Sequence, residues 1–299
     1  MEGADIVINL AGREYETPNY KFGEIHVDIP RRLARLAGAA GALRFVQASS
    51  VGAAADAPNA ELRSRFDGES AVRDAFPNAS VVRLATLVGA EDRSTNYFAS
   101  SVLKAPFTPL WDGGETRFRP LHVADAAAGI NAIAKSDDCM GKTFTFVGPK
   151  VYTYKDFASM VINEIRENDN TLPLPLGVGL VMAKAKEAIT SNLPVVPPAW
   201  ALDPKMTSDH LLSLAEGLHY DPTDAQIQGA DLQAVGIVPR DIAKGLSVEH
   251  LRSYRYEGYD FGNTATDAGQ AVALYKQHAT QGKDWQERDV EKTIRKEQV

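Results

Sequence analysis

Continuous apolar runs, each closed by small or polar residues, mark the first part of the chain. They cover residues 4–12, 43–48 and 80–84, and the first ends in the small-residue turn Ala11-Gly12. None of them alternates apolar with polar positions. Runs of this kind predict strands that are covered on both faces, as in a parallel sheet.

Helical periodicity separates these runs. Asp28 is expected to cap a helix that has Pro30 in its first turn and ends at Gly41. A second helix is predicted over 61–76, where Pro77 stops it. Strands and helices that alternate with short connections imply right-handed crossovers. We therefore predict an α/β fold with an incomplete doubly wound, Rossmann-like parallel sheet.

The same alternation continues further along the chain. An alanine-rich helix is predicted over 123–134 and a short strand over 143–148. Thr153 and Asp156 have the spacing of an N-terminal capping pair for a helix that runs through Ile165.

Composition then changes, and it suggests three parts. Residues 1–150 form the C-terminal part of a nucleotide-binding domain, and 151–259 form a smaller, proline-rich and mostly helical domain. Residues 260–299 are polar, with helical periodicity over 268–279 and 285–294, and are expected to form a helical extension.

A doubly wound sheet normally carries a Gly-x-Gly-x-x-Gly phosphate loop after its first strand. The nearest imitation here is Gly177-Val178-Gly179, which follows the proline-rich run 172–176 rather than a predicted strand, so we reject it. The predicted strands would then be the fourth to sixth of the sheet. Residues 6–10 would form an unprotected edge, and a separate chain or a further segment is expected to supply strands one to three and the phosphate loop.

Charge and composition exclude several classes of function. The chain has 32 basic and 39 acidic residues, a net charge of −7, which argues against nucleic acid as a partner. The single cysteine, Cys139, excludes an internal disulfide and favours a reducing compartment or the mitochondrial matrix. No apolar stretch approaches the ~20 residues of a membrane span. The apolar run 172–183, which precedes Lys184 and Lys186, is either an amphipathic element at a membrane surface or a membrane subunit, or ordinary core.

Several segments resemble one family, the short-chain-dehydrogenase-like accessory subunit of mitochondrial complex I known as alpha-subcomplex subunit nine. The resemblance covers about residues 4–256. The segments that carry it are Glu69–Ala79, Val82–Leu84, Gly89–Arg93, Asn96–Ala99, Phe118–Asp125 and Gly141–Pro149.

This resemblance implies a function. The family is a set of non-catalytic subunits on the matrix side of the mitochondrial inner membrane. They lie among other complex I subunits where the peripheral and membrane arms meet, near the quinone site, and hold NADPH as a structural ligand. The alternatives are an active NADP(H)-dependent atypical short-chain dehydrogenase or epimerase, and an RNA-associated relative of the same fold. The net acidity counts against the last of these.

The residues that would carry dehydrogenase chemistry are absent. Enzymes of this fold use a tyrosine to exchange a proton and a lysine one helical turn later to lower its pKa. By the resemblance, Glu61 stands at the tyrosine position and Arg65 at the lysine position. A glutamate, ionised at neutral pH, would repel a developing oxyanion. We therefore predict no catalytic residues. Arg65 either holds a ribose or phosphate group or is a solvated helix residue.

One wall of a cofactor site can still be predicted. Ser49 and Ser50 either face the cofactor or merely close their strand, and His26 stands where many relatives have a structural asparagine. The histidines show no metal-ligand spacing, so we predict no metal site. The predicted cofactor-binding residues are Asn9, Leu10, Ala11, Gly12, Ala48, Ser49, Ser50, Arg65, Leu84, Ala85, Thr86 and Leu87.

Overall fold

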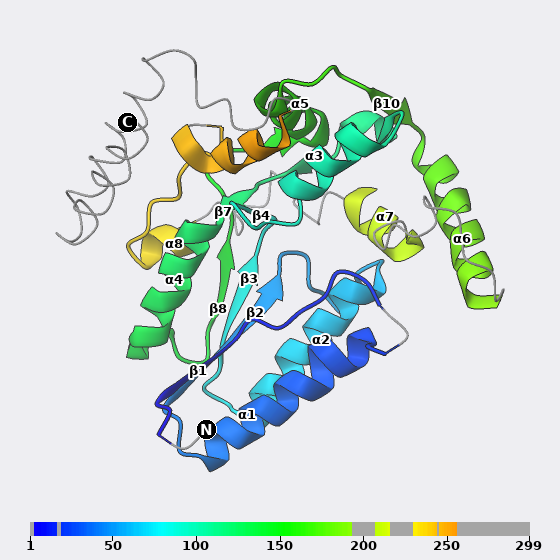
Figure 1. The fold of residues 1–299 in the computed structure, drawn as a ribbon. Helices are drawn as coiled ribbons and strands as arrows, with labels where there is room; N and C mark the ends of the chain where they lie inside the picture. Colours follow the sequence, from blue (N-terminus) through cyan, green and yellow to red (C-terminus); the bar gives the residue numbers. More distant parts are fainter. Residues whose placement is uncertain (1–2, 17–18, 193–206, 216–229, 244, 256–299) are drawn as a thin grey trace, which may run out of the picture. The chain divides into compact units, whose positions relative to one another are not determined.

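The fold is taken from a computed structural model of the chain (Figure 1). The chain divides into two compact units, Met1–Tyr254 and Arg255–Val299. The predicted extension 260–299 lies outside the described residues. The residues that the structure describes are 3–16, 19–192, 207–215, 230–243 and 245–255.

A parallel sheet forms the centre of the first unit. Its strands are β1 (Ile6–Asn9), β2 (Arg44–Ser50), β3 (Ser80–Leu84) and β8 (Thr143–Phe146), in the order β1-β2-β3-β8. Each neighbouring pair is parallel. The predicted α/β fold with a parallel sheet is confirmed.

Helices cover both faces of this sheet (Figure 1). Helices α1 (Ile29–Ala39) and α2 (Ala60–Ala75) lie on one face, and α4 (Val123–Lys135) lies on the other. On β2, Phe45 belongs to the core cluster under α1 and α2, whereas its neighbour Val46 belongs to the cluster under α4. Successive residues of a strand point to opposite faces, so both faces of β2 are buried, as its apolar run predicts.

Strand β1 departs from that prediction. Val7 packs under α1 and α2, but Ile8 is 42% exposed and Leu10, just beyond the strand, is 64% exposed. The expectation of two fully covered faces is therefore wrong for this strand. The physical reason is its position: β1 pairs with β2 on one side, and the described residues place no strand on the other.

The first helix begins earlier than predicted. A π-helical turn, Gly23–Asp28, runs directly into α1. Asp28 has helical backbone angles and makes no capping hydrogen bond, so its predicted role as a cap is wrong. Pro30 has no N–H to donate to the carbonyl of His26, and the widened turn accommodates this interruption. The predicted end at Gly41 is confirmed, because this glycine has a φ of +77° beyond the last turn.

The remaining elements of the first unit lie outside the four-stranded sheet. The predicted capping pair is confirmed: Thr153 and Asp156 form a capping box at the start of α5. The other elements are β4 (Leu87–Val88), α3 (Thr95–Lys104), β5 (Thr108–Trp111), β6 (Arg117–Phe118), β7 (Leu121–His122), β9 (Tyr152–Thr153), α5 (Tyr154–Ile165), β10 (Thr171–Leu174), α6 (Leu176–Asn192), α7 (Ser208–Ala215), α8 (Ala230–Ala234) and the 3-10 helix Gly245–Tyr254.

The proline-rich run contains a strand that the sequence did not predict. Strand β10 pairs in parallel with β5, with Pro173 opposite Leu110. Proline is tolerated there because the pair is only two strands wide. Gly177-Val178-Gly179 therefore does follow a strand, but it lies on α6. A Cβ on Gly179 would come within 2.8 Å of the Trp111 ring, so close packing explains that glycine.

Candidate functional site

The carboxyl ends of β1, β2 and β3 lie along one edge of the sheet. Asn9 pairs with Gln47, and Ser50 pairs with Leu84, so the three strands end side by side. In open α/β sheets, ligands bind at this edge. The structure therefore brings the predicted strand-end residues 9–12, 48–50 and 84–87 to one place.

Asn9 shapes the turn that leaves β1. Its side chain is buried, donates from Nδ2 to Gln47 Oε1 at 2.8 Å, and accepts at Oδ1 from the N–H of Ala11 at 3.1 Å. Leu10, Ala11 and Gly12 are exposed. The turn thus presents backbone and small side chains outward while its anchor points into the sheet.

Glu61 and Arg65 lie one turn apart near the start of α2. The Nε atom of Arg65 donates to Glu61 Oε1 at 2.9 Å, and Nη2 lies 2.9 Å from the same oxygen. Burial raises the pKa of the Glu61 carboxyl, and the adjacent Arg65 charge opposes that rise. Glu61 and Arg65 therefore form an internal ion pair within α2.

Arg65 also contacts the turn after β1. A Cβ on Gly12 would lie 3.2 Å from Arg65 Nη1, so the two groups lie side by side. Nη2 donates to the carbonyl oxygen of Arg13 at 3.4 Å. Arg65 is therefore not a solvated surface residue. It bridges α2 and the turn, with Nη1 directed at the exposed Gly12.

Ser49 has a structural partner. Its hydroxyl donates to Glu69 Oε1 at 2.5 Å. Arg83 makes a two-pronged contact with the same carboxylate, Nε to Oε1 at 2.9 Å and Nη2 to Oε2 at 2.7 Å. Both Ser49 and Glu69 are buried. Of the two interpretations of the serine pair, the one in which Ser49 closes its strand fits this geometry, while Ser50 and Ala48 remain half-buried at the edge.

The third strand end contributes mainly backbone. Leu84, Ala85 and Leu87 pack against the core cluster under α4. Thr86 accepts at its carbonyl from the N–H of Leu121 at 2.9 Å. At this edge of the sheet, these residues contribute core packing and backbone groups rather than reactive side chains.

His26 is buried behind the Glu61–Arg65 pair. Its Nε2 accepts from the N–H of Arg13 at 3.1 Å, so the proton of the neutral ring lies on Nδ1, which donates to Ser64 Oγ at 2.8 Å. Ser64 in turn donates to the carbonyl of Glu61 at 2.7 Å. Burial, and then the Arg65 charge, lowers the pKa of His26 to about 3. The ring is neutral at physiological pH and serves to position its neighbours.

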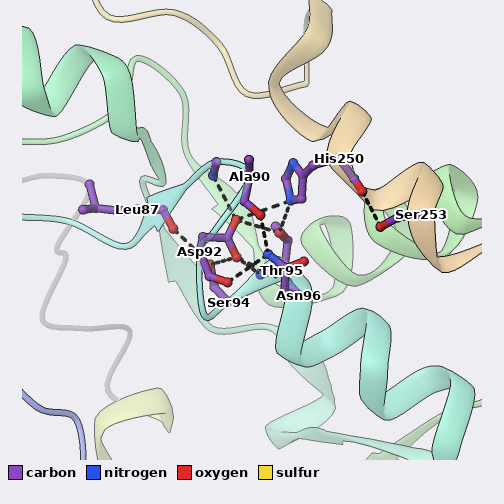
Figure 2. A network of polar contacts seen from close by, with 9 residues as sticks. Leu87, Ala90, Asp92, Ser94, Thr95, Asn96, His250 and Ser253 are labelled. Atoms are coloured by element: carbon purple, nitrogen blue, oxygen red, sulfur yellow. Dashed lines mark hydrogen bonds and ion pairs between the residues drawn. The ribbon is translucent and has the colours of Figure 1, made fainter.

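A second polar cluster joins α3 to the segment that ends at Tyr254 (Figure 2). Thr95 Oγ1 donates to Asp92 Oδ2 at 2.6 Å and lies 3.0 Å from His250 Nε2. The three side chains have the identities of a nucleophilic triad but not its geometry. The hydroxyl proton is directed to the carboxylate rather than to the imidazole, and Thr95 is fully buried. The cluster therefore has a structural role and connects α3 to the 3-10 helix Gly245–Tyr254.

Metal-ligand clusters and membrane-spanning helices are both absent from the part of the chain that the structure describes. No group of three or more His, Cys, Asp or Glu side chains there has the arrangement needed for a metal ion. In the same part of the chain, no helix combines the length and apolar character that crossing a bilayer requires.

Sequence reasoning missed one contributor to this region, Asp209 on α7. Its carboxylate accepts from the N–H of Ala60 at 2.6 Å and from the N–H of Glu61 at 3.3 Å. No local pattern marks a contact between residues so far apart in the chain, and nothing in the sequence signalled it.

No protein-family model matches the chain. It is 36% identical over 274 residues to "NADH dehydrogenase [ubiquinone] 1 alpha subcomplex subunit 9, mitochondrial" of Arabidopsis thaliana, which covers 89% of this chain and 65% of that protein. The mouse protein of the same name is 32% identical, covering 85% of this chain and 63% of its own length. The chain thus spans slightly less than two thirds of these relatives.

Among solved structures, the fold is similar to an NADPH-dependent quinone oxidoreductase from Escherichia coli complexed with NADPH. The TM-score is 0.58, with 16% sequence identity, over 81% of this chain and 75% of that one. At this level of identity the likeness concerns the fold alone. It agrees with the Rossmann-like arrangement of the parallel sheet.

Proposed function

We propose that this chain, a homologue of alpha subcomplex subunit 9 of mitochondrial NADH dehydrogenase over most of its length, is a non-catalytic accessory subunit of respiratory complex I. The observation that carries the proposal is the buried ion pair of Glu61 and Arg65, at the two positions that the resemblance aligns with the tyrosine and lysine of dehydrogenases of this fold. The resemblance suggests a place on the matrix side of the inner membrane, where the two arms of the complex meet near the quinone site.

A structural NADPH fits part of this proposal. When bound to enzymes of this fold, the cofactor supplies a hydride. Here Glu61 is engaged by Arg65 and offers no phenol to exchange a proton. The Nη1 atom of Arg65, directed at the exposed turn 10–12, is suited to a ribose hydroxyl or a phosphate. The described residues thus fit one wall of a nucleotide site, and a phosphate loop has to come from elsewhere.

The difference between the two edges of the sheet argues for an additional strand beside β1. At the β8 edge, the N–H of Thr145 donates to Asp231 Oδ2 at 2.6 Å, and α8 packs there. At the β1 edge, Ile8 and Leu10 are exposed instead. Natural sheets protect open edges, and only one of these is protected by the described residues. A further segment or a separate chain therefore completes the sheet at β1 and carries the phosphate loop.

Helix α6 supplies a second contact surface. Val178, Val181 and Met182 are 45%, 69% and 39% exposed, whereas Ala183 and Lys186 of the same helix are buried. An apolar face turned outward marks an interaction site. The charged residues of α6 are Lys184, Lys186 and Glu187, and of the two lysines only Lys184 is exposed. This face is suited to a membrane-arm subunit of the complex or to the adjoining membrane surface.

Deleting the gene in cells of the source organism tests the proposal. We expect loss of fully assembled complex I and of its NADH:ubiquinone activity, both restored by the wild-type chain. The Glu61→Gln variant should restore them equally, because the carboxylate performs no chemistry. A normal amount of active complex in the deleted cells would refute the proposed role.

A turnover assay separates the non-catalytic proposal from the enzymatic alternative. The purified protein, supplied with NADPH and a quinone or ketone, should oxidise no NADPH above the background rate. Sustained turnover that the Glu61→Gln variant abolishes would instead identify an active reductase.

A further inference from the structure

The N-terminus of α2 has two independent sets of hydrogen-bond acceptors. Asn59 is a local cap: its Oδ1 accepts from the N–H of Leu62 at 2.8 Å. Asp209 is a remote one: its two carboxylate oxygens accept from the N–H groups of Ala60 and Glu61 at 2.6 and 3.3 Å. The remote contact joins positions 149 and 148 residues apart, so it cannot be explained by the local sequence of the helix.

The remote acceptor is firmly held. Asp209 lies in the first turn of α7, whose residue Ser208 donates from both its backbone N–H and its hydroxyl to Glu187 Oε1, at 2.7 and 3.0 Å. Glu187 belongs to α6, and Leu211 of α7 is only 2% exposed. Helix α6 therefore braces α7 while α7 presents a carboxylate to α2.

The position that Asp209 occupies has the character of an anion site. Free N–H groups in the first turn of a helix, together with the positive end of its dipole, bind carboxylate or phosphate groups. The Nδ2 atom of Asn59 is also buried there and has no hydrogen-bond partner among the described residues. This end of α2 therefore has more donors than the internal acceptors satisfy.

We propose that α7 is an intramolecular plug in which Asp209 replaces an external anion at the N-terminus of α2. The plug holds the backbone N–H of residue 61, the position that the resemblance aligns with the tyrosine of short-chain dehydrogenases. When α7 is displaced, the amides of residues 60 and 61 and the amide group of Asn59 can receive the phosphate or carboxylate of an external ligand. The contact between α7 and α2 lies within one chain, so the plug does not require assembly into a larger complex.

Amide hydrogen exchange resolved at single residues, on the full chain, tests the contact. In Asp209→Ala, the amides of Ala60 and Glu61 should exchange at least tenfold faster than in the wild type, while Leu62 keeps its protection. In Asn59→Ala, the amide of Leu62 should exchange faster, while the amides of Ala60 and Glu61 keep their protection. The matched control is Asp28→Ala, which removes an aspartate that makes no capping bond at its helix, and it should change none of these amides.

A titration with inorganic phosphate tests the plug itself. Asp209→Ala should show saturable binding that restores protection at residues 60 and 61, and the wild type should show at least tenfold weaker binding. If Asp209→Ala fails to fold, Asp209→Asn keeps the shape and removes the charge, and it should show the same change in smaller measure. Unchanged exchange at Ala60 and Glu61, or equal phosphate binding by variant and wild type, would overturn the proposal.

Discussion

Single buried charges fix α2 against the sheet. Glu69 is 2% exposed, and it receives hydrogen bonds from Ser49 of β2 and Arg83 of β3. Removing one member of such a buried cluster leaves its partners unpaired in a poorly hydrated site. We expect Glu69→Ala to lower the free energy of unfolding by about 3–5 kcal/mol, measured by urea denaturation.

The matched control for that variant is Asp28→Ala. The carboxylate of Asp28 pairs with Arg31 on an exposed face of the helix, where an ion pair contributes at most about 1 kcal/mol. Equal losses in the two variants would show that the Glu69 cluster does not stabilise the fold.

His26 predicts a dependence of stability on pH. Its pKa is about 3 in the folded chain, against an ordinary value of 6.5. As the pH falls below about 6.5, the unfolded chain takes up the proton first, so the free energy of unfolding decreases from there towards pH 3. The variant His26→Asn lacks the titrating ring, and its stability should fall less steeply over this range in urea denaturation. Parallel pH profiles would contradict the assignment.

What the sequence could predict at this scale was local. The ends of the apolar runs located the residues of the sheet edge, because parallel strands end together. The cap at Asp28 was wrong because a helical turn, Gly23–Asp28, already precedes α1 and places Asp28 within helical backbone. Asp209 was missed because its partners, Ala60 and Glu61, lie far away in the sequence.

At the scale of elements, the crossing of α2 and the π-helical turn depends on one glycine. A Cβ on Gly68 would lie 1.9 Å from the carbonyl oxygen of His26. Gly68→Ala should therefore push the two elements apart and cost about 1–3 kcal/mol, as overpacking does.

The matched control is Gly23→Ala in the same pair of elements. A Cβ there would meet nothing within 4 Å, and alanine is favoured over glycine in a helix by about 0.5–1 kcal/mol. Thermal unfolding of both variants compares them directly. A Gly68→Ala protein as stable as Gly23→Ala would show that the elements do not pack as closely as described.

Element types followed from sequence more readily than their contacts did. The capping box at Thr153 and the strands of the sheet rest on patterns within a few residues. Strand β10 was overlooked because prolines usually exclude a strand. Pro173 is acceptable because β10 pairs with β5 alone, in a sheet of two strands.

At the scale of the whole molecule, the outward apolar face of α6 should serve assembly rather than folding. We expect Val181→Glu to leave the unfolding free energy within about 0.5 kcal/mol, because the side chain is 69% exposed. The same variant should lower the amount of chain recovered with complex I.

Val238→Glu is the matched control, since Val238 is 81% exposed at another place on the chain. It should be recovered like the wild type. Equal recovery of the two variants would remove α6 from the proposed interface.

Two properties define the proposed function: assembly of the chain with complex I, and the absence of NADPH oxidation by the chain. The most direct measurement is to tag the chain in its own cells, purify it under native conditions, and assay the bound nucleotide before and after NADH:ubiquinone turnover. We predict that it is recovered in a fixed ratio with complex I, and that NADPH recovered with it is not oxidised during turnover. Recovery as a free protein that oxidises NADPH would contradict the account.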